Sequence, residues 1–161
     1  MKITSSAFQE GKTIPTKYTY HGVTYHGVDG GKNISLPFSW TDVPPGTKSS
    51  ALSIIDPHPV AKNWVHWFVI NIPGNVSALA EGASQKFMPN GTKELFNTYG
   101  TLGYGGPEPP KGSGAHPYVV TLYALNIEKI DLAEKATLSE FNKALEGTII
   151  ATAKITGMYE R

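Results

Sequence analysis

Short apolar runs punctuated by glycine, proline and asparagine make up most of the chain, a pattern typical of strands. Four runs are rich in β-branched and aromatic residues, which favour strands; they lie at 51–56, 65–72, 118–126 and 148–159. Weaker patterns predict strands at 2–8, 17–20 and 35–40. The interval 78–95 is broken by glycine and proline and is predicted to be mostly loop. The chain is therefore expected to be mainly β.

The run VHWFVINI is apolar on both faces. Strict alternation divides its side chains between two faces. One face carries His66, Phe68, Ile70 and Ile72, and the opposite face carries Val65, Trp67 and Val69. A strand with two apolar faces is expected inside a sheet that is covered on both sides.

One helix is predicted at 137–147. Thr137 and Glu140 have the spacing of a capping box, and Gly147 is expected at the C-cap. The buried stripe of this helix is predicted to comprise Leu138, Phe141 and Leu145.

The 161 residues are expected to form one domain spanning 1–161. The 14 lysines and arginines are scattered and the net charge is only +1, which argues against a nucleic-acid partner. There is no cysteine, so disulfides and thiolate metal sites are excluded. No apolar run has the length of a signal peptide or a bilayer span, which predicts a cytoplasmic protein without integral membrane contact.

Four polar residues lie where predicted strands begin or end. Asp56 ends one strand and His66 lies at the start of the next, with a connection short enough for antiparallel neighbours. His116 and Tyr118 open a third strand and share one face by the two-residue period. If the third strand begins at the same end of the sheet, all four side chains meet there.

Two imidazoles and a phenol can donate hydrogen bonds, so this cluster fits a small anion, with Asp56 orienting a histidine. The preceding stretch GYGGPEPPKGSGAHPY is rich in glycine and proline, and its amides are expected to complete an anion-binding nest. A metal site formed by Asp56, His66 and His116, with His58 as a fourth ligand, is an alternative. A serine hydrolase using Ser113 is less favoured because no GxSxG motif is present. His21 and His26 are interpreted as turn residues.

These stretches resemble the phosphatidylethanolamine-binding protein family, in its Raf kinase inhibitor-like bacterial and archaeal branch. NISLPFSWTDVPPGTKSSALSIIDP is similar to the stretch that leads into the family's DPDAP motif. WVHWFVINIP is similar to its second block, and GYGGPEPPKGSGAHPYVVTLYAL to the block that runs from GxxPP to HRY. The resemblance covers nearly the whole chain.

The resemblance implies a large central antiparallel sheet flanked by a smaller sheet and short helices. It carries the pocket onto Asp56, His66, His116 and Tyr118, with Trp64, Gly106 and Pro107 as walls. It implies binding of phosphate, phosphorylethanolamine or phospholipid head groups, or carboxylates, with no cofactor, no structural metal and no enzymatic turnover. It also implies a kinase or protease as protein partner, and homodimerisation is compatible with it.

Two departures from the family pattern lie at the pocket rim. DPDAP reads DPHPV here, which puts His58 at the second acidic position, and HRY reads HPY, which puts Pro117 at the arginine. The two loops are expected to pack without an ion pair, His58 to add a donor, and the pocket to favour anions over amines. The main alternative function is inhibition of a partner through the segment 83–97, with a vestigial pocket.

Overall fold

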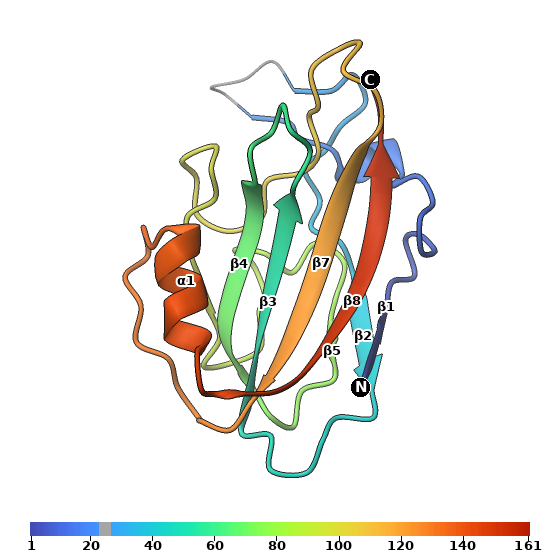
Figure 1. Cartoon of the computed structure of the whole chain (residues 1–161). Helices are drawn as coiled ribbons and strands as arrows, with labels where there is room; N and C mark the ends of the chain where they lie inside the picture. The colour runs from blue at the N-terminus through green and yellow to red at the C-terminus, as the bar shows by residue number, and fades with distance from the viewer. Residues whose placement is uncertain (23–26) are drawn as a thin grey trace.

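Two antiparallel sheets form the protein in the computed structural model, which describes residues 1–22 and 27–161 (Figure 1). The larger sheet has five strands in the order β6 (Lys93–Glu94), β4 (Trp64–Pro73), β3 (Ser49–Asp56), β7 (His116–Leu125) and β8 (Ile149–Tyr159). The smaller sheet has the order β1 (Lys2–Thr4), β2 (Phe38–Thr41) and β5 (Ala78–Leu79). The expected mainly β architecture with a large and a small sheet is confirmed.

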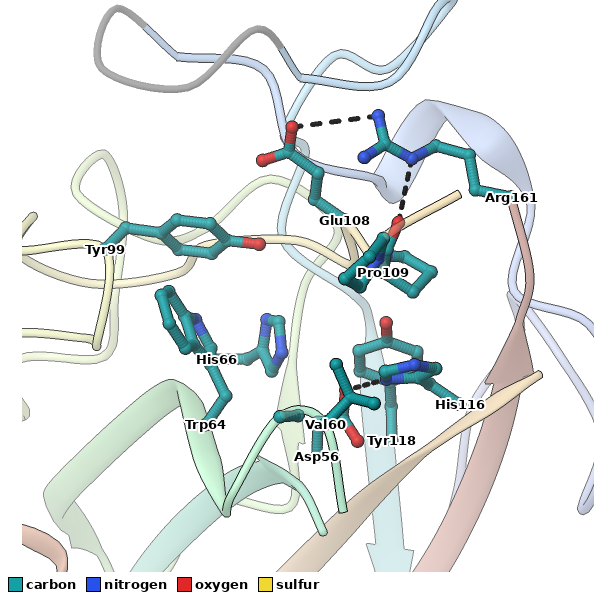
Figure 2. Close-up of a pocket in the computed structure, with 12 residues that line it drawn as sticks. Asp56, Val60, Trp64, His66, Tyr99, Glu108, Pro109, His116, Tyr118 and Arg161 are labelled. Atoms are coloured by element: carbon teal, nitrogen blue, oxygen red, sulfur yellow. Dashed lines mark hydrogen bonds and ion pairs between the residues drawn. The ribbon is translucent and has the colours of Figure 1, made fainter. Parts of the chain in front are cut away.

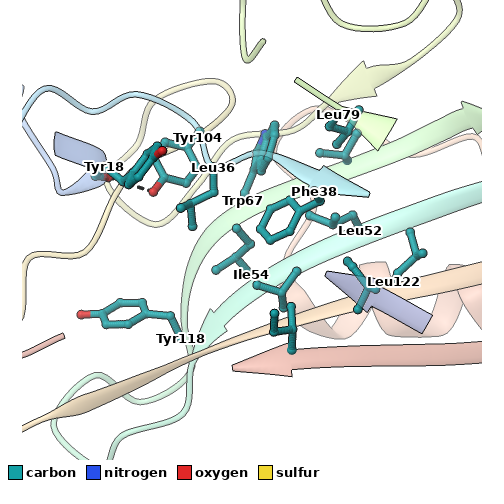
Figure 3. Packing of buried hydrophobic residues seen from close by; sticks show 14 of the residues in the cluster. Tyr18, Leu36, Phe38, Leu52, Ile54, Trp67, Leu79, Tyr104, Tyr118 and Leu122 are labelled. Carbon is teal, nitrogen blue, oxygen red and sulfur yellow. Dashed lines mark hydrogen bonds between the residues drawn. The ribbon is translucent and has the colours of Figure 1, made fainter. Parts of the chain in front are cut away.

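The main hydrophobic core lies between the two sheets, as Figure 3 shows. Phe38 and Leu79 of the small sheet pack in one cluster with Leu52, Trp67 and Leu122 of the large sheet. These five side chains are at most 2% exposed. Burial of this apolar surface holds the sheets together, at roughly 25 cal/mol per Å² removed from water.

The opposite face of the large sheet is covered by the helix α1 (Leu138–Leu145) and its flanking loops. The predicted capping box is confirmed: the Glu140 amide donates to the Thr137 hydroxyl and the Thr137 amide donates to the Glu140 carboxylate. Phe141 is fully buried and stacks on Phe68 of β4, with ring centroids 4.2 Å apart. The helix ends at Leu145, and its C-cap residue is Glu146 rather than the predicted Gly147.

The weaker strand predictions were only partly right. Residues 17–20 do not form a strand: the 3₁₀ helix η1 (Thr16–Tyr18) begins after Pro15, and the Thr19 hydroxyl donates to the carbonyl oxygen of Thr16 at 2.6 Å. That side chain-to-backbone bond competes with strand pairing. The strands predicted at 2–8 and 35–40 are reduced to β1 and β2, whereas 78–95 is mostly loop, as expected. His26 lies outside the described residues.

Strand β4 is buried on both faces as predicted, but its alternation is interrupted twice. Trp67 pairs with Ile54 of β3, and Val65 pairs with the residue that follows Ile54. His66, which lies between Trp67 and Val65, therefore has no pairing partner in β3. A second extra residue lies near Asn71, whose φ is 59°. Two face predictions were therefore wrong. Ile72 packs in the core between the sheets and not on the face of Phe68, and Val65 packs on the helix side and not on the face of Trp67.

In the parts of the chain that are described, no helix has the length and apolar character needed to cross a membrane.

Candidate functional site

The predicted polar cluster forms at one end of the large sheet. Asp56 at the end of β3 pairs in register with Trp64 at the start of β4, and β7 runs antiparallel to β3 from His116 onward. The side chains of these three strands therefore meet at the same sheet end, as the sequence predicted. They line a cavity of about 300 Å³.

Five of the predicted residues line this cavity, which we call the anion pocket after the ligand that the sequence predicts for it: Asp56, Trp64, His66, His116 and Tyr118 (Figure 2). Seven lining residues were not predicted: Val60, Ala61, Tyr99, Glu108, Pro109, Pro110 and Arg161. Gly106 and Pro107, predicted as walls, are not among the described lining residues. The glycine-proline loop instead contacts the pocket through the residues that follow them.

Asp56 and His116 form a buried hydrogen-bonded pair. His116 Nδ1 lies 2.6 Å from Asp56 Oδ2, and the other carboxylate oxygen accepts from the His58 amide at 2.9 Å. His116 is fully buried, and its Nε2 lies 2.9 Å from the Ser113 hydroxyl oxygen. Asp56 does orient a histidine, as expected. Both ring nitrogens of His116 are engaged within the protein, however, so His116 supports the pocket wall rather than offering a donor to its interior.

The chain of Asp56, His116 and Ser113 has the spacing of a hydrolase triad, but the surroundings of Ser113 do not suit a nucleophile. Its hydroxyl donates to the carbonyl oxygen of Pro110 at 2.6 Å. The amides of Gly112 and Ser113 already donate to the carbonyl oxygens of Arg161 and Pro110, so they cannot stabilise an oxyanion. Ser113 does not line the pocket. The chain of bonds fastens the loop to the sheet.

His66 occupies the first irregular position of β4, and a bulge of this kind turns a side chain away from the regular alternation. Its Nδ1 lies 2.7 Å from the carbonyl oxygen of Gly105, which can only accept, so Nδ1 carries the proton. Burial lowers the pKa of His66 to about 4, and this outweighs the raising effects of the Gly105 carbonyl and of Asp56. At neutral pH the ring is uncharged, and Nε2 has a lone pair.

Tyr118 contributes a hydroxyl that has no hydrogen-bond partner among the described residues, although the side chain is only 1% exposed. Figure 2 shows it rising from β7 toward the space beneath Pro109. Burial first, and then the charge of Asp56, raise the pKa of Tyr118 above its ordinary value. The phenol therefore stays protonated and can donate.

The roof of the pocket is formed by a loop that Arg161 fastens in place. Its Nε donates to the Pro109 carbonyl oxygen at 2.8 Å and one terminal nitrogen donates to the Gly27 carbonyl oxygen at 3.1 Å. Glu108 accepts from the Gly27 amide at 2.9 Å and lies 3.8 Å from the Arg161 guanidinium (Figure 2). No short sequence pattern indicates this pair, because it joins positions far apart in the chain.

The amides of Gly105 and Gly106 are not free for the predicted nest. The Gly105 amide donates to the His66 carbonyl oxygen at 2.8 Å, and the Gly106 amide donates to the Asn33 side chain at 2.7 Å. At Gly106 the need for glycine is one of space, since a β-carbon there would overlap the carbonyl oxygen of Tyr18. At this position the glycine lets the loop approach the backbone of Tyr18.

The departure at His58 places its ring against His116, with centroids 3.8 Å apart and planes 19° apart. Its Nδ1 accepts from the Val60 amide at 3.2 Å, and His58 is not among the described residues that line the pocket. The two rim loops thus contact each other through stacked rings. Among the described residues no three histidines or carboxylates are arranged to hold a metal ion, so Asp56, His66 and His116 do not form the alternative metal site.

A model of the family described as phosphatidylethanolamine-binding protein matches residues 4–160. The chain belongs to the phosphatidylethanolamine-binding protein family.

Relatives of this family member span its whole length. The UPF0098 protein of Methanothermobacter thermautotrophicus is 38% identical, over 100% of this chain and 99% of the relative. The crystal structure of YbcL of Escherichia coli, described as a new member of the mammalian family, matches with a TM-score of 0.90 and 34% identity, covering 99% of this chain and 98% of YbcL. A carboxypeptidase Y inhibitor complexed with its cognate proteinase shares only the fold, with a TM-score of 0.53 and 18% identity, covering 93% of this chain and 76% of the inhibitor.

Proposed function

We propose that this family member binds a small anion in the anion pocket without turning it over, and that binding regulates a protein partner. The observation that supports this most directly is the Tyr118 hydroxyl, a buried donor that lies on the wall of a cavity of about 300 Å³ and has no partner among the described residues. Leaving such a group unpaired costs about 1–3 kcal/mol, which a ligand oxygen recovers. Trp64, Tyr99 and Pro109 surround the space left for an organic group on the anion.

Roles within the pocket follow from which atoms are already engaged. Tyr118 donates to the anion, and His66 contacts it through Nε2. Asp56 and His116 keep the wall in shape through their mutual hydrogen bond. Arg161 and Glu108 hold the roof.

Calorimetric titration with inorganic phosphate and with phosphorylethanolamine tests the proposal. Tyr118→Phe keeps the ring and removes the hydroxyl, so affinity should fall about 10- to 100-fold, the value of a hydrogen bond to a charged group. Tyr123→Phe is the control, since its hydroxyl pairs with Ser53 elsewhere on the sheet and does not line the pocket. Absence of binding at millimolar ligand, or equal affinity for wild type and Tyr118→Phe, contradicts the proposal.

A second candidate function is inhibition of a protease through the segment 83–97. Phe87 is 58% exposed, an unusual state for a large aromatic side chain. The segment that carries Phe87 is fixed by hydrogen bonds to a buried side chain. The carboxylate of Glu94 accepts from the Ser84 hydroxyl, the Gln85 amide and the Trp67 indole. A rigid, exposed aromatic residue fits a binding loop, since little entropy is lost when it binds.

An assay for inhibition of carboxypeptidase Y by the purified protein tests the second candidate. Phe87→Ala should abolish inhibition and leave phosphate affinity unchanged. Ile150→Ala, which removes an exposed apolar side chain from β8, is the matched control and should inhibit like wild type. If Phe87→Ala inhibits as well as wild type, this segment is not the inhibitory surface.

A further inference from the structure

Two lining residues, Tyr118 and His66, can bind a ligand in complementary ways. Tyr118 offers a donor, because its hydroxyl has no hydrogen-bond partner among the described residues. His66 offers an acceptor, because its Nδ1 proton is directed to the Gly105 carbonyl oxygen and leaves the lone pair on Nε2. An anion whose oxygens all lack protons satisfies Tyr118 but meets His66 lone pair against lone pair. A ligand that carries both an unprotonated oxygen and an O–H satisfies both groups.

The charged groups around His66 do not favour a doubly charged ligand. Asp56 of β3 and His116 of β7 act on it in opposite senses, and the phenols of Tyr99 and Tyr118 are protonated. Across the pocket, Glu108 and Arg161 place one negative and one positive charge in the roof. The lining therefore offers no excess of positive charge to a dianion.

We propose that the anion pocket selects ligands that bring their own acidic proton, namely phosphate monoesters in the singly charged form, and discriminates against phosphate diesters and sulfate esters. The monoester O–H donates to His66 Nε2, and an unprotonated oxygen accepts from Tyr118. This rests on the proposed function and refines it. An intact phospholipid is a diester, so the preferred ligand is a free phosphorylated alcohol rather than a lipid in a bilayer.

The selectivity depends on whether the ligand or the His66 ring supplies the proton of the hydrogen bond between them. A phosphate monoester has a second pKa of about 6, so about one molecule in ten carries the proton at pH 7. With a pKa of about 4, about one His66 ring in a thousand is protonated at pH 7. A diester or sulfate ester has to use that rare protonated ring. The monoester is therefore favoured about 100-fold at pH 7.

Methyl phosphate, dimethyl phosphate and methyl sulfate are matched probes that differ in the acidic proton. At pH 7 methyl phosphate should bind about 100-fold more tightly than the other two, and at pH 5 only about tenfold, because His66 is then more often protonated. Between pH 5 and 6 the affinity for methyl sulfate should fall about tenfold while that for methyl phosphate changes little. Calorimetry at pH 7 in two buffers should show uptake of nearly one proton with methyl phosphate.

The outcomes separate this inference from the proposed function. Equal affinity for methyl phosphate and methyl sulfate at pH 7, or binding of methyl phosphate without proton uptake, overturns the inference and leaves an anion pocket. If none of the three probes nor inorganic phosphate binds, the proposed function fails as well.

A variant gives a second measurement. His66→Gln places an amide that can donate near the position of Nε2, so it should bind methyl sulfate and methyl phosphate within about tenfold of each other. His21→Gln, an exposed residue that does not line the pocket, should keep the full selectivity. Circular dichroism verifies that both variants are folded. If His66→Gln is folded and still binds methyl phosphate about 100-fold more tightly than methyl sulfate, His66 is not the group that accepts the ligand's acidic proton.

Discussion

The carboxylate of Asp56 is the most sensitive point of the pocket wall, and two substitutions separate its roles. Asp56→Ala removes both acceptors, so the His116 Nδ1 proton, fully buried, and the His58 amide lose their partners. Each unpaired donor costs about 1–3 kcal/mol, so the free energy of unfolding should fall by about 2–6 kcal/mol. In a domain of this size that lowers the melting temperature by about 5–15 °C.

Asp56→Asn should behave differently. Its amide oxygen still accepts from the His58 amide, and its NH₂ donates to His116 Nδ1 if the ring proton moves to Nε2. The Ser113 hydroxyl can accept from that nitrogen while donating to Pro110, so every group keeps a partner. Loss of a charge-assisted bond then costs only about 1 kcal/mol.

Urea unfolding followed by circular dichroism measures both costs on the same footing. Asp56→Ala should lower the urea midpoint of unfolding strongly and Asp56→Asn should lower it weakly. The dependence of the free energy of unfolding on urea concentration should stay the same in both variants. If the two variants are equally destabilised, the charge and not the set of hydrogen bonds holds the wall together. If Asp56→Ala lies within about 1 kcal/mol of wild type, water replaces the carboxylate and the reasoning is refuted.

Three further outcomes are expected. His66 binds a proton less readily in the folded state than in the unfolded state. The free energy of unfolding should therefore fall by about 3 kcal/mol as the pH drops from 6.5 to 4. Urea titrations at both pH values should show a smaller fall for His66→Asn than for wild type. Gly106→Ala should abolish soluble expression because its β-carbon meets the backbone at Tyr18, whereas Gly46→Ala, with open space around it, should express and lose about 1 kcal/mol through its positive φ. A fluorophosphonate probe should leave Ser113 unmodified by mass spectrometry, and stoichiometric labelling would show it to be an activated nucleophile.

The sequence predicted those features that rest on local patterns. The four long strands and the capping box at Thr137 depend on runs of a few residues, and the meeting of Asp56, His66 and His116 follows from antiparallel pairing over a short connection. Residues 17–20 were misassigned because Thr19 bonds to the backbone three positions earlier, a local competitor that strand propensity ignores.

The rest of the site depends on contacts that no short pattern contains. Arg161 and Tyr99 reach the pocket from distant segments and carry no motif of their own. His116 and the amides of Gly105 and Gly106 are not free to act as the expected donors, for a different reason. They have the right chemistry, but each is already paired inside the protein, and pairing is a property of the folded chain.

The extra residue at His66 has a consequence for how this protein can change. Regular alternation in β4 ties each side chain to one of two cores, so most substitutions there alter packing and stability. His66 has no partner in the β3 register and faces the pocket instead. One position can thus be exchanged to alter ligand choice without repacking either core, and even its deletion would leave Val65 and Trp67 on their present faces, because the remaining residues then alternate regularly. The irregularity separates the chemistry of the pocket from the architecture that carries it.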